Sequence, residues 1–194
     1  MEVSVAQEKQ FQGAIILMTH CFIDDPVCRY LYPSTSQYLR HFPEYVRIYG
    51  QKGVEMGATH ICGDVGAALW VPPNTHPDED ALDALLERSV AADAKAELFD
   101  VYAEFDRAHP TEPHWFLPLM GVDPFMKRQG IGAALMEYGL AICDSEGTLA
   151  YLESTKPENV PFYEQFGFKH HYTIDVGGHP KVTTMIRPPQ TINT

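Results

Sequence analysis

VDPFMKRQGIGA, residues 122–133, leads from an apolar strand through Asp-Pro into a short basic loop, and a helix begins at once. Glycines at 130 and 132 remove side chains where a ligand would approach the backbone, and unpaired N–H groups at a helix start attract anions. Lys127 and Arg128 lie at the positive end of the helix dipole, where cations are mildly unfavourable for the helix itself. A ligand explains them better than helix stability does, so the loop predicts a pyrophosphate site.

Two better-known phosphate motifs do not fit this loop. The dinucleotide fingerprint G-x-G-x-x-G needs a third glycine where this chain has Leu135, and no P-loop pattern occurs anywhere in the sequence. A glycine pair before a helix is common, and a basic pair in a loop is often only solvated. The loop alone therefore predicts an anion site and leaves the identity of the anion open.

Composition predicts one globular domain over residues 1–194, since this length with 45% hydrophobic residues supports one sizeable core. A formal charge of -12 argues against a nucleic-acid partner and favours a cationic or amine-bearing substrate. The start, MEVSVAQEKQ, has no basic segment followed by an apolar one, and no apolar run approaches the roughly 20 residues of a membrane helix. We therefore expect a cytoplasmic protein without a membrane partner.

The cysteines predict neither a disulfide framework nor a metal site. Cys21, Cys28, Cys62 and Cys143 show no C-x-x-C spacing, and four are few for a chain of this length. His60 and Cys62 could share one face of a strand, but two ligands without a second pair make a poor zinc site. We expect buried free thiols and no metal.

Apolar periodicity predicts alternating strands and helices in the middle of the chain and a hairpin at its end. Asp25-Pro26 ends the first helix, and Pro118 and Gly121 predict a bulge in the strand that carries them. The expected strands are 2–5, 59–62, 66–71, 114–122, 149–155, 168–176 and 181–186. The expected helices are 9–22, 34–57, one broken helix or two within 78–107, 131–146 and 159–165. This order favours an α/β (α+β) fold with a mixed sheet rather than a doubly wound one.

A second motif, YLESTKPENVPFYEQFGF, occupies residues 151–168, downstream of the loop. Together the two motifs resemble the GNAT superfamily of N-acetyltransferases, and most of all its puromycin N-acetyltransferase group, over residues 114–187. The resemblance implies a mostly antiparallel central sheet flanked by helices, with acetyl-CoA as cosubstrate. It also implies an acceptor side built by helices within residues 9–57, chiefly 22–49, and by the segment 176–181.

The resemblance further implies which residues hold acetyl-CoA. Backbone N–H groups of the loop and helix start would bind the pyrophosphate, and the strand before them would bind the pantetheine arm and meet the oxyanion. Lys127 departs from the glutamine or arginine usual at its position, keeping the charge without the planar donor fork. The implied contacts are Met120, Gly121, Val122, Lys127, Arg128, Gln129, Gly130, Ile131, Gly132 and Ala133, with Asn159 as a further polar contact. Asn159 is also a plausible turn or helix-cap residue.

Tyr163 and Glu153 are the catalytic candidates. By resemblance Tyr163 lies beside the thioester sulfur, where a phenol with a pKa of about 10 can protonate a departing thiolate. Glu153 lies in the strand that would flank the acetyl group and could take the proton of the acceptor ammonium. The alternatives are a core tyrosine packed under the sheet and an outward-facing strand carboxylate.

These residues predict direct acetyl transfer from acetyl-CoA to a primary amine, with no covalent enzyme intermediate. The rival hypothesis is a CoA-binding sensor or interaction module without chemistry, and a longer acyl donor also fits the motifs. The acceptor is left open among small amines, amino-sugars, nucleoside antibiotics and peptide N-termini, and the protein is expected to be a monomer or homodimer.

Overall fold

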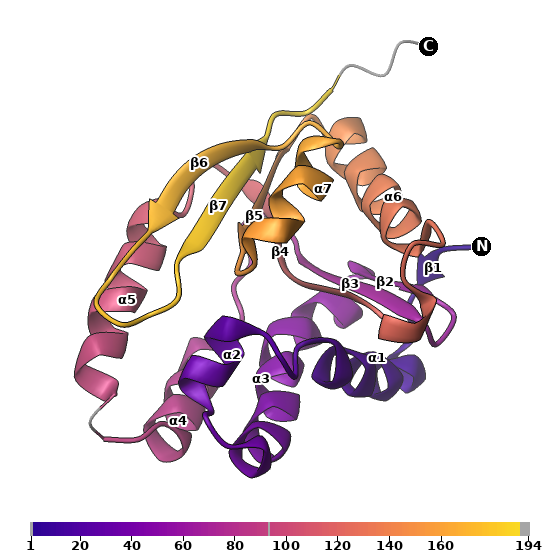
Figure 1. The fold of residues 1–194 in the computed structure, drawn as a ribbon. Coiled ribbons are helices and arrows are strands. Elements are labelled where there is room, and N and C mark those ends of the chain that lie inside the picture. The colour runs from indigo at the N-terminus through magenta and orange to yellow at the C-terminus, as the bar shows by residue number, and fades with distance from the viewer. Residues whose placement is uncertain (1, 93, 191–194) are drawn as a thin grey trace.

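A single seven-stranded sheet organises the computed structural model, which describes residues 2–92 and 94–190 (Figure 1). Its order is β1-β2-β3-β4-β5-β7-β6, and every neighbouring pair is antiparallel except β4 and β5, which are parallel. The strands are β1 Ser4–Val5, β2 Thr59–Cys62, β3 Gly66–Val71, β4 His114–Val122, β5 Leu149–Ser154, β6 Lys169–Ile174 and β7 Val182–Arg187. The mixed, mostly antiparallel sheet predicted from the sequence is confirmed.

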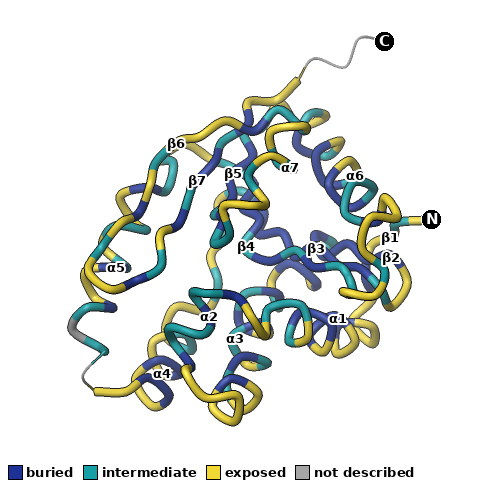
Figure 2. Tube along the Cα trace, viewed as in Figure 1, coloured by how far each residue is buried: buried dark blue, intermediate teal, exposed yellow. Residues whose placement is uncertain are grey.

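Helices cover both faces of this sheet. Successive side chains of β3 point to opposite faces, and because they are apolar, each face needs helices packed against it. Ala67 and Leu69 pack into the cluster formed by α1 and α3, whereas Ala68 and Trp70 pack into the cluster formed with α6. These buried strands form the dark centre of Figure 2. The helices are α1 Glu8–Cys21, α2 Pro26–Leu31, α3 Thr35–Glu55, α4 Glu79–Ser89, α5 Lys95–Ala108, α6 Ile131–Ser145 and α7 Val160–Glu164, with the short 3-10 helices η1 Pro124–Met126 and η2 Pro157–Asn159.

The helix α2 was not predicted. Asp25-Pro26 does end the first helical segment, but a new helix starts there, because the Asp25 carboxylate accepts hydrogen bonds from the N–H groups of Val27 and Cys28 at 3.0 and 3.2 Å. An aspartate at the N-cap followed by proline at the first helical position is a start signal as well as a stop. Elsewhere α3 continues through Pro43, and the segment 78–107 forms two helices.

The strands β4 and β5 separate halfway along their length. Their parallel pairing ends at Leu117 opposite Leu152, while β4 continues along β3 to Val122 and β5 continues along β7 to Ser154. Pro118, the next residue of β4, has no N–H to donate, and the β3–β4 register shifts at the same level, which confirms the predicted bulge. Beyond Pro118 the backbone groups of β4 that face β5 have no strand partner among the residues that the structure describes.

Candidate active site

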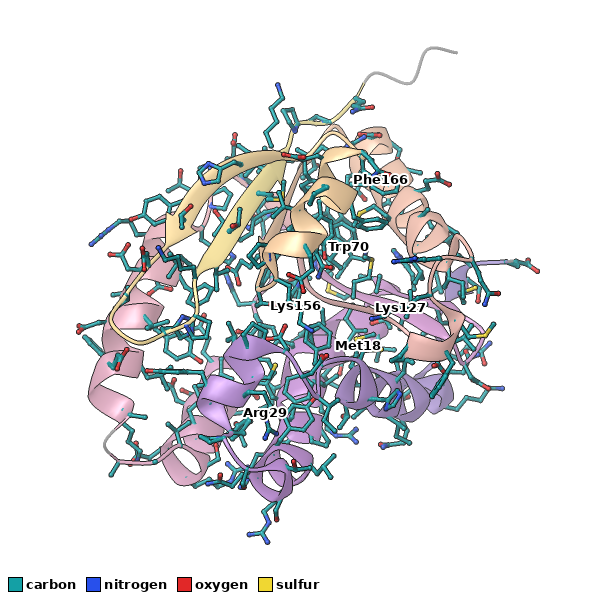
Figure 3. All side chains as sticks on the ribbon, in the orientation of Figure 1. Met18, Arg29, Trp70, Lys127, Lys156 and Phe166 are labelled. Atoms are coloured by element: carbon teal, nitrogen blue, oxygen red, sulfur yellow. The ribbon has the colours of Figure 1, made fainter. Side chains whose placement is uncertain are left out.

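An open cleft of about 1660 Å³ lies where β4 and β5 separate. Its walls are the end of β4, the loop into α6, the end of β5, and the segment from η2 to α7. Lys127 and Lys156, both labelled in Figure 3, line this cleft. We call it the donor cleft.

The loop before α6 is shaped to present backbone N–H groups. Arg128 and Gly130 have φ angles of 62° and 82°. Gly130 is the N-cap residue of α6, and because it has no side chain, it cannot cap the helix with a side-chain hydrogen bond. The first turn of the helix closes with the N–H of Ala134 on the carbonyl of Gly130, at 2.9 Å. The N–H groups of the three residues between them have no intrahelical partner, so this end of the donor cleft suits an anion.

Nearly all of the predicted acetyl-CoA contacts border this one cleft. Only Gln129 is not among its lining residues, and the Gln129 side-chain amide lies 3.7 Å from the Met126 sulfur instead. Those that line it are Met120, Gly121, Val122, Lys127, Arg128, Gly130, Ile131, Gly132, Ala133 and Asn159.

The fold places different demands on the three glycines at the donor cleft. A Cβ on Gly121 would lie 2.9 Å from the Cβ of Cys21, so close packing of α1 on β4 requires that glycine. Gly130 has open space but a positive φ, which disfavours any side chain. Gly132 has neither constraint, because a Cβ there would meet the Phe162 ring at an ordinary 3.5 Å. The protein itself therefore gives no packing reason for a glycine at 132.

Glu153 has the electrostatics of a buried base. Its side chain is 16% exposed, its Oε1 accepts a hydrogen bond from the Tyr151 hydroxyl at 3.0 Å, and the His109 Nδ1 lies 3.5 Å away. Burial raises the pKa of Glu153 to about 8, against the smaller opposing effect of the Tyr151 hydrogen bond. Burial also lowers the pKa of His109 to about 4, with like charge at His114 and His76 adding to the effect. The His109 ring is therefore neutral near pH 7.

Tyr163 projects from α7 to the donor cleft. Its ring packs edge-on against Phe162 and Phe168, with centroids 5.4 and 6.2 Å apart, and its hydroxyl makes no hydrogen bond within residues 2–92 and 94–190. Burial, with a smaller effect of the Asp25 charge, raises the pKa of Tyr163 to about 12. The phenol is therefore protonated at neutral pH and has a proton to donate.

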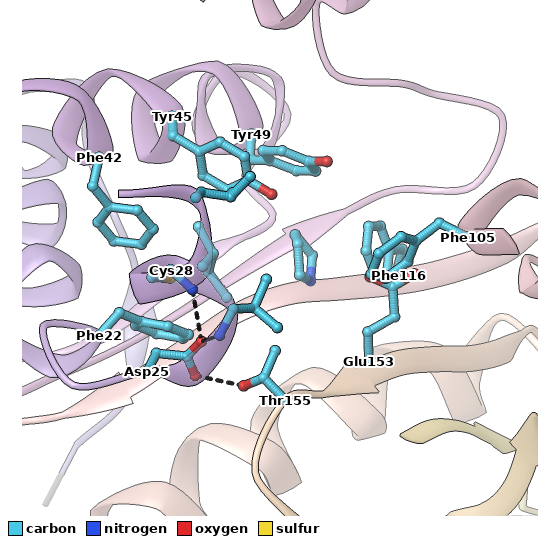
Figure 4. A pocket seen from close by; sticks show the side chains of 14 residues that line it. Phe22, Asp25, Cys28, Phe42, Tyr45, Tyr49, Phe105, Phe116, Glu153 and Thr155 are labelled. Carbon is cyan, nitrogen blue, oxygen red and sulfur yellow. Dashed lines mark hydrogen bonds between the residues drawn. The ribbon is translucent and has the colours of Figure 1, made fainter. Parts of the chain in front are cut away.

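A second cavity adjoins the donor cleft (Figure 4). We call it the acceptor cavity. Residues common to both linings are Phe22, Asp25, Pro118, Glu153 and Thr155. Helices α2 and α3 supply much of its wall, in line with the acceptor side expected within residues 9–57. The segment 176–181 supplies none of its lining residues, and Phe105 of α5 and Phe116 of β4 take part instead.

Sequence reasoning missed the connection that ties the two cavities together. The Thr155 hydroxyl donates to Asp25 Oδ2 at 2.5 Å, and the Lys156 ammonium donates to Asp24 Oδ1 at 2.8 Å. These bonds fix the chain between α1 and α2 against the end of β5. Asp25-Pro26 signals the cap, but no local pattern indicates a partner 130 residues away.

The described part of the chain has neither a metal-ligand cluster nor a membrane-spanning helix. No group of three or more His, Cys, Asp or Glu side chains is placed to hold a metal ion. None of the helices there combines the length and the apolar character needed to cross a membrane.

Comparisons with known proteins show which proteins this chain is similar to. Residues 81–168 match the model of the acetyltransferase (GNAT) family. An uncharacterized N-acetyltransferase of Schizosaccharomyces pombe is 28% identical over 98% of this chain and 85% of its own length.

Two solved structures share the fold along nearly the whole chain. A protein from Corynebacterium glutamicum described as histone acetyltransferase HPA2 and related acetyltransferase has a TM-score of 0.67, with 23% identity over 99% of this chain and 98% of its own. A polyamine N-acetyltransferase of Drosophila melanogaster, which catalyses the formation of N-acetylagmatine, has a TM-score of 0.66, with 15% identity over 96% and 99%. The family match over residues 81–168, the relative and the shared fold together show that this chain is similar to proteins of the acetyltransferase (GNAT) family.

Proposed function

We propose that this protein transfers the acetyl group of acetyl-CoA directly to the primary amine of a small molecule. The observation that carries the proposal is the position of Glu153 at the junction of the donor cleft and the acceptor cavity, where its carboxyl is 16% exposed and its pKa is raised to about 8. The family supports acetyl-CoA as the donor, and a structural neighbour that forms N-acetylagmatine supports a small amine as the acceptor. The puromycin acetyltransferase group is the subgroup that the loop and the 151–168 motif favour.

The donor cleft would supply contacts for the pyrophosphate and for the pantetheine arm of acetyl-CoA. The free N–H groups at the start of α6 would hold the pyrophosphate, with Lys127 and Arg128 beside them. The unpaired edge of β4 from Pro118 to Val122 would bind the amide groups of the pantetheine arm, and backbone N–H groups of this edge would meet the oxyanion. This arrangement would bring the thioester to the level of Glu153.

Glu153 and Tyr163 would divide the proton transfers. An ammonium loses two protons on becoming an amide, of which one ends on the sulfur and the other leaves to solvent. Glu153 would accept a proton from the nitrogen, which then attacks the thioester carbonyl as the carbon–sulfur bond breaks. Because the pKa of Tyr163 lies above the value of about 8.5 for a thiol, its hydroxyl would act first as a hydrogen-bond donor to the departing sulfur.

Acetyl-CoA binding tests the donor cleft, and Gly132 offers the sharpest variant. Saturating acetyl-CoA should raise the melting temperature by about 5 to 10 °C, since ligand at 100 times its Kd adds about 2.7 kcal/mol. Gly132→Ala should leave the free protein equally or more stable, because the Cβ fits and alanine favours a helix. It should nevertheless weaken acetyl-CoA binding about tenfold, because the methyl group keeps the ligand from the backbone.

Gly13→Ala is the matched control for this variant. Gly13 lies within α1, a Cβ at this position would have nothing within 4 Å, and the residue is absent from the donor cleft. The control should gain helix stability and keep the wild-type affinity for acetyl-CoA by calorimetry. Equal affinities of both glycine variants for acetyl-CoA would contradict the proposed position of the pyrophosphate.

The rate should depend on pH through Glu153. Below pH 8 its carboxyl is mostly protonated and cannot accept a proton, so activity rises as the pH approaches 8. For an alkylamine with a pKa of about 10 that binds as its ammonium, the plot of log kcat/KM against pH should have a slope near 1 below pH 8 and level off between pH 8 and 10. Glu153→Gln should show a slope of about 1 throughout, and an unchanged break at pH 8 in that variant would assign the break to another group.

A further inference from the structure

The acceptor cavity is apolar and aromatic on every side except one. Asp25 and Glu153 are the only Asp or Glu residues among its lining residues in the described chain, and no lysine, arginine or histidine lines it. Six aromatic side chains make up much of the rest: Phe22, Phe42, Tyr45, Tyr49, Phe105 and Phe116. Figure 4 shows Phe42, Tyr45 and Tyr49 along one wall, with Glu153 and Thr155 away from them.

Asp25 is not free to bind a substrate cation. It is 2% exposed, its Oδ1 accepts the N–H groups of Val27 and Cys28, and its Oδ2 accepts the Thr155 hydroxyl. These bonds hold the start of α2 and join it to the end of β5. Glu153 is therefore the single carboxyl of the cavity that can receive an amine.

Among the described residues that line the wall opposite Glu153, none is an Asp or Glu that could bind a second cation. Burial raises the pKa of Tyr49 to about 12 and that of Tyr45 above its usual range, so both phenols stay neutral at physiological pH. Their rings lie 4.7 Å apart, and Phe42 stacks on Tyr45 at 5.7 Å. Attraction of a cation to aromatic faces is weaker than the cost of removing a primary ammonium from water without a paired charge.

We propose that the acceptor is a monoamine with an aromatic or other apolar body, and that the cavity disfavours diamines. This inference rests on the proposed function, because the same cavity must deliver the amine to Glu153. The amine end would lie at Glu153 and the apolar body against the aromatic wall. The aromatic side chains of the wall favour an apolar body. None of the described residues of the wall carries a carboxylate, so a second ammonium would be buried with no partner, and this selects against diamines.

A matched pair of amines tests the inference directly. Hexylamine and 1,5-diaminopentane have the same length and differ only in a terminal methyl against a terminal ammonium, and 2-phenylethylamine adds an aromatic body. Release of the CoA thiol from acetyl-CoA is measured with each. We expect kcat/KM for hexylamine and 2-phenylethylamine to exceed that for 1,5-diaminopentane by at least 100-fold. Equal or greater efficiency with the diamine overturns the inference while it supports amine acetylation.

A charge placed in the wall should change the preference. Leu31, a half-buried residue at the end of α2, lines the acceptor cavity and has no part in the proposed chemistry. Leu31→Glu should raise kcat/KM for 1,5-diaminopentane at least tenfold relative to hexylamine, whereas Leu31→Gln, of the same size without the charge, should not. The thermal shift with acetyl-CoA shows that each variant is folded. An unchanged amine preference in folded Leu31→Glu contradicts the assignment of this wall.

The proposed function fails in a different way from the inference. If acetyl-CoA stabilises the protein but none of the three amines releases thiol, small-amine acetylation is wrong and the inference falls with it. If thiol is released with all three amines at similar efficiency, amine acetylation stands and only the monoamine preference is lost.

Discussion

Replacing Glu153 by glutamine should lower kcat/KM for the acceptor amine by about 10²- to 10⁴-fold, the range that a positioned general base contributes. The amide keeps the size of the carboxyl and an oxygen that can still accept the Tyr151 hydroxyl, so the fold is retained. It cannot take a proton at any ordinary pH. Affinity for acetyl-CoA should stay within about twofold, because the loop and α6 that hold the pyrophosphate are unchanged.

Steady-state kinetics and calorimetry on the same preparation separate these effects. Glu87→Gln is the matched control, since Glu87 is an exposed residue of α4 whose carboxylate pairs with Lys95. The control should retain full activity. If Glu153→Gln also retained full activity, with a normal pH profile, another base or water alone would accept the proton.

Tyr163→Phe should lower kcat by about 10²-fold with little change in acetyl-CoA affinity, because the hydroxyl acts on the departing sulfur rather than on the bound ground state. The ring packing against Phe162 and Phe168 does not involve the hydroxyl, which has no hydrogen-bond partner among the described residues. The variant should therefore fold as well as the wild type.

The leaving group supplies a second measurement for Tyr163. A thioester of a more acidic thiol needs less help to depart, so Tyr163→Phe should lose less activity with such a donor than with acetyl-CoA. Tyr138→Phe is the matched control, because Tyr138 lies on α6 outside the donor cleft and packs on His60. An equal loss with both donors would place the hydroxyl in substrate binding rather than in protonation of sulfur.

The sequence predicted more of the residues that border the donor cleft than of those that line the acceptor cavity. The reason is that the first depend on neighbours in the sequence, whereas the second depend on contacts between residues far apart in the sequence. The loop at 122–133 and the bulge at Pro118 depend on local chemistry, on glycine, proline and a helix start, which neighbouring residues reveal. Gly121 shows the limit of such reasoning. The sequence predicts that Gly121 contacts acetyl-CoA. The structure shows that the close packing of Cys21 of α1 also requires a glycine at this position.

The acceptor cavity depends on contacts between distant parts of the chain. Phe105 and Phe116 join aromatic side chains of α3 only because the fold brings α5 and β4 beside them, and no periodicity indicates that meeting. The Asp25 to Thr155 hydrogen bond is of the same kind. The environment of Glu153 could not be predicted either, since its raised pKa comes from burial that only the folded chain creates.

Amine-dependent release of the CoA thiol from acetyl-CoA tests the central claim most directly, with the acetylated product identified by mass spectrometry. The wild-type protein should release one thiol for each amide formed with 2-phenylethylamine, and Glu153→Gln should be slower by at least 10²-fold. Acetyl-CoA binding without any thiol release across a panel of primary amines would contradict the claim. That result would show a protein that binds CoA without performing the transfer.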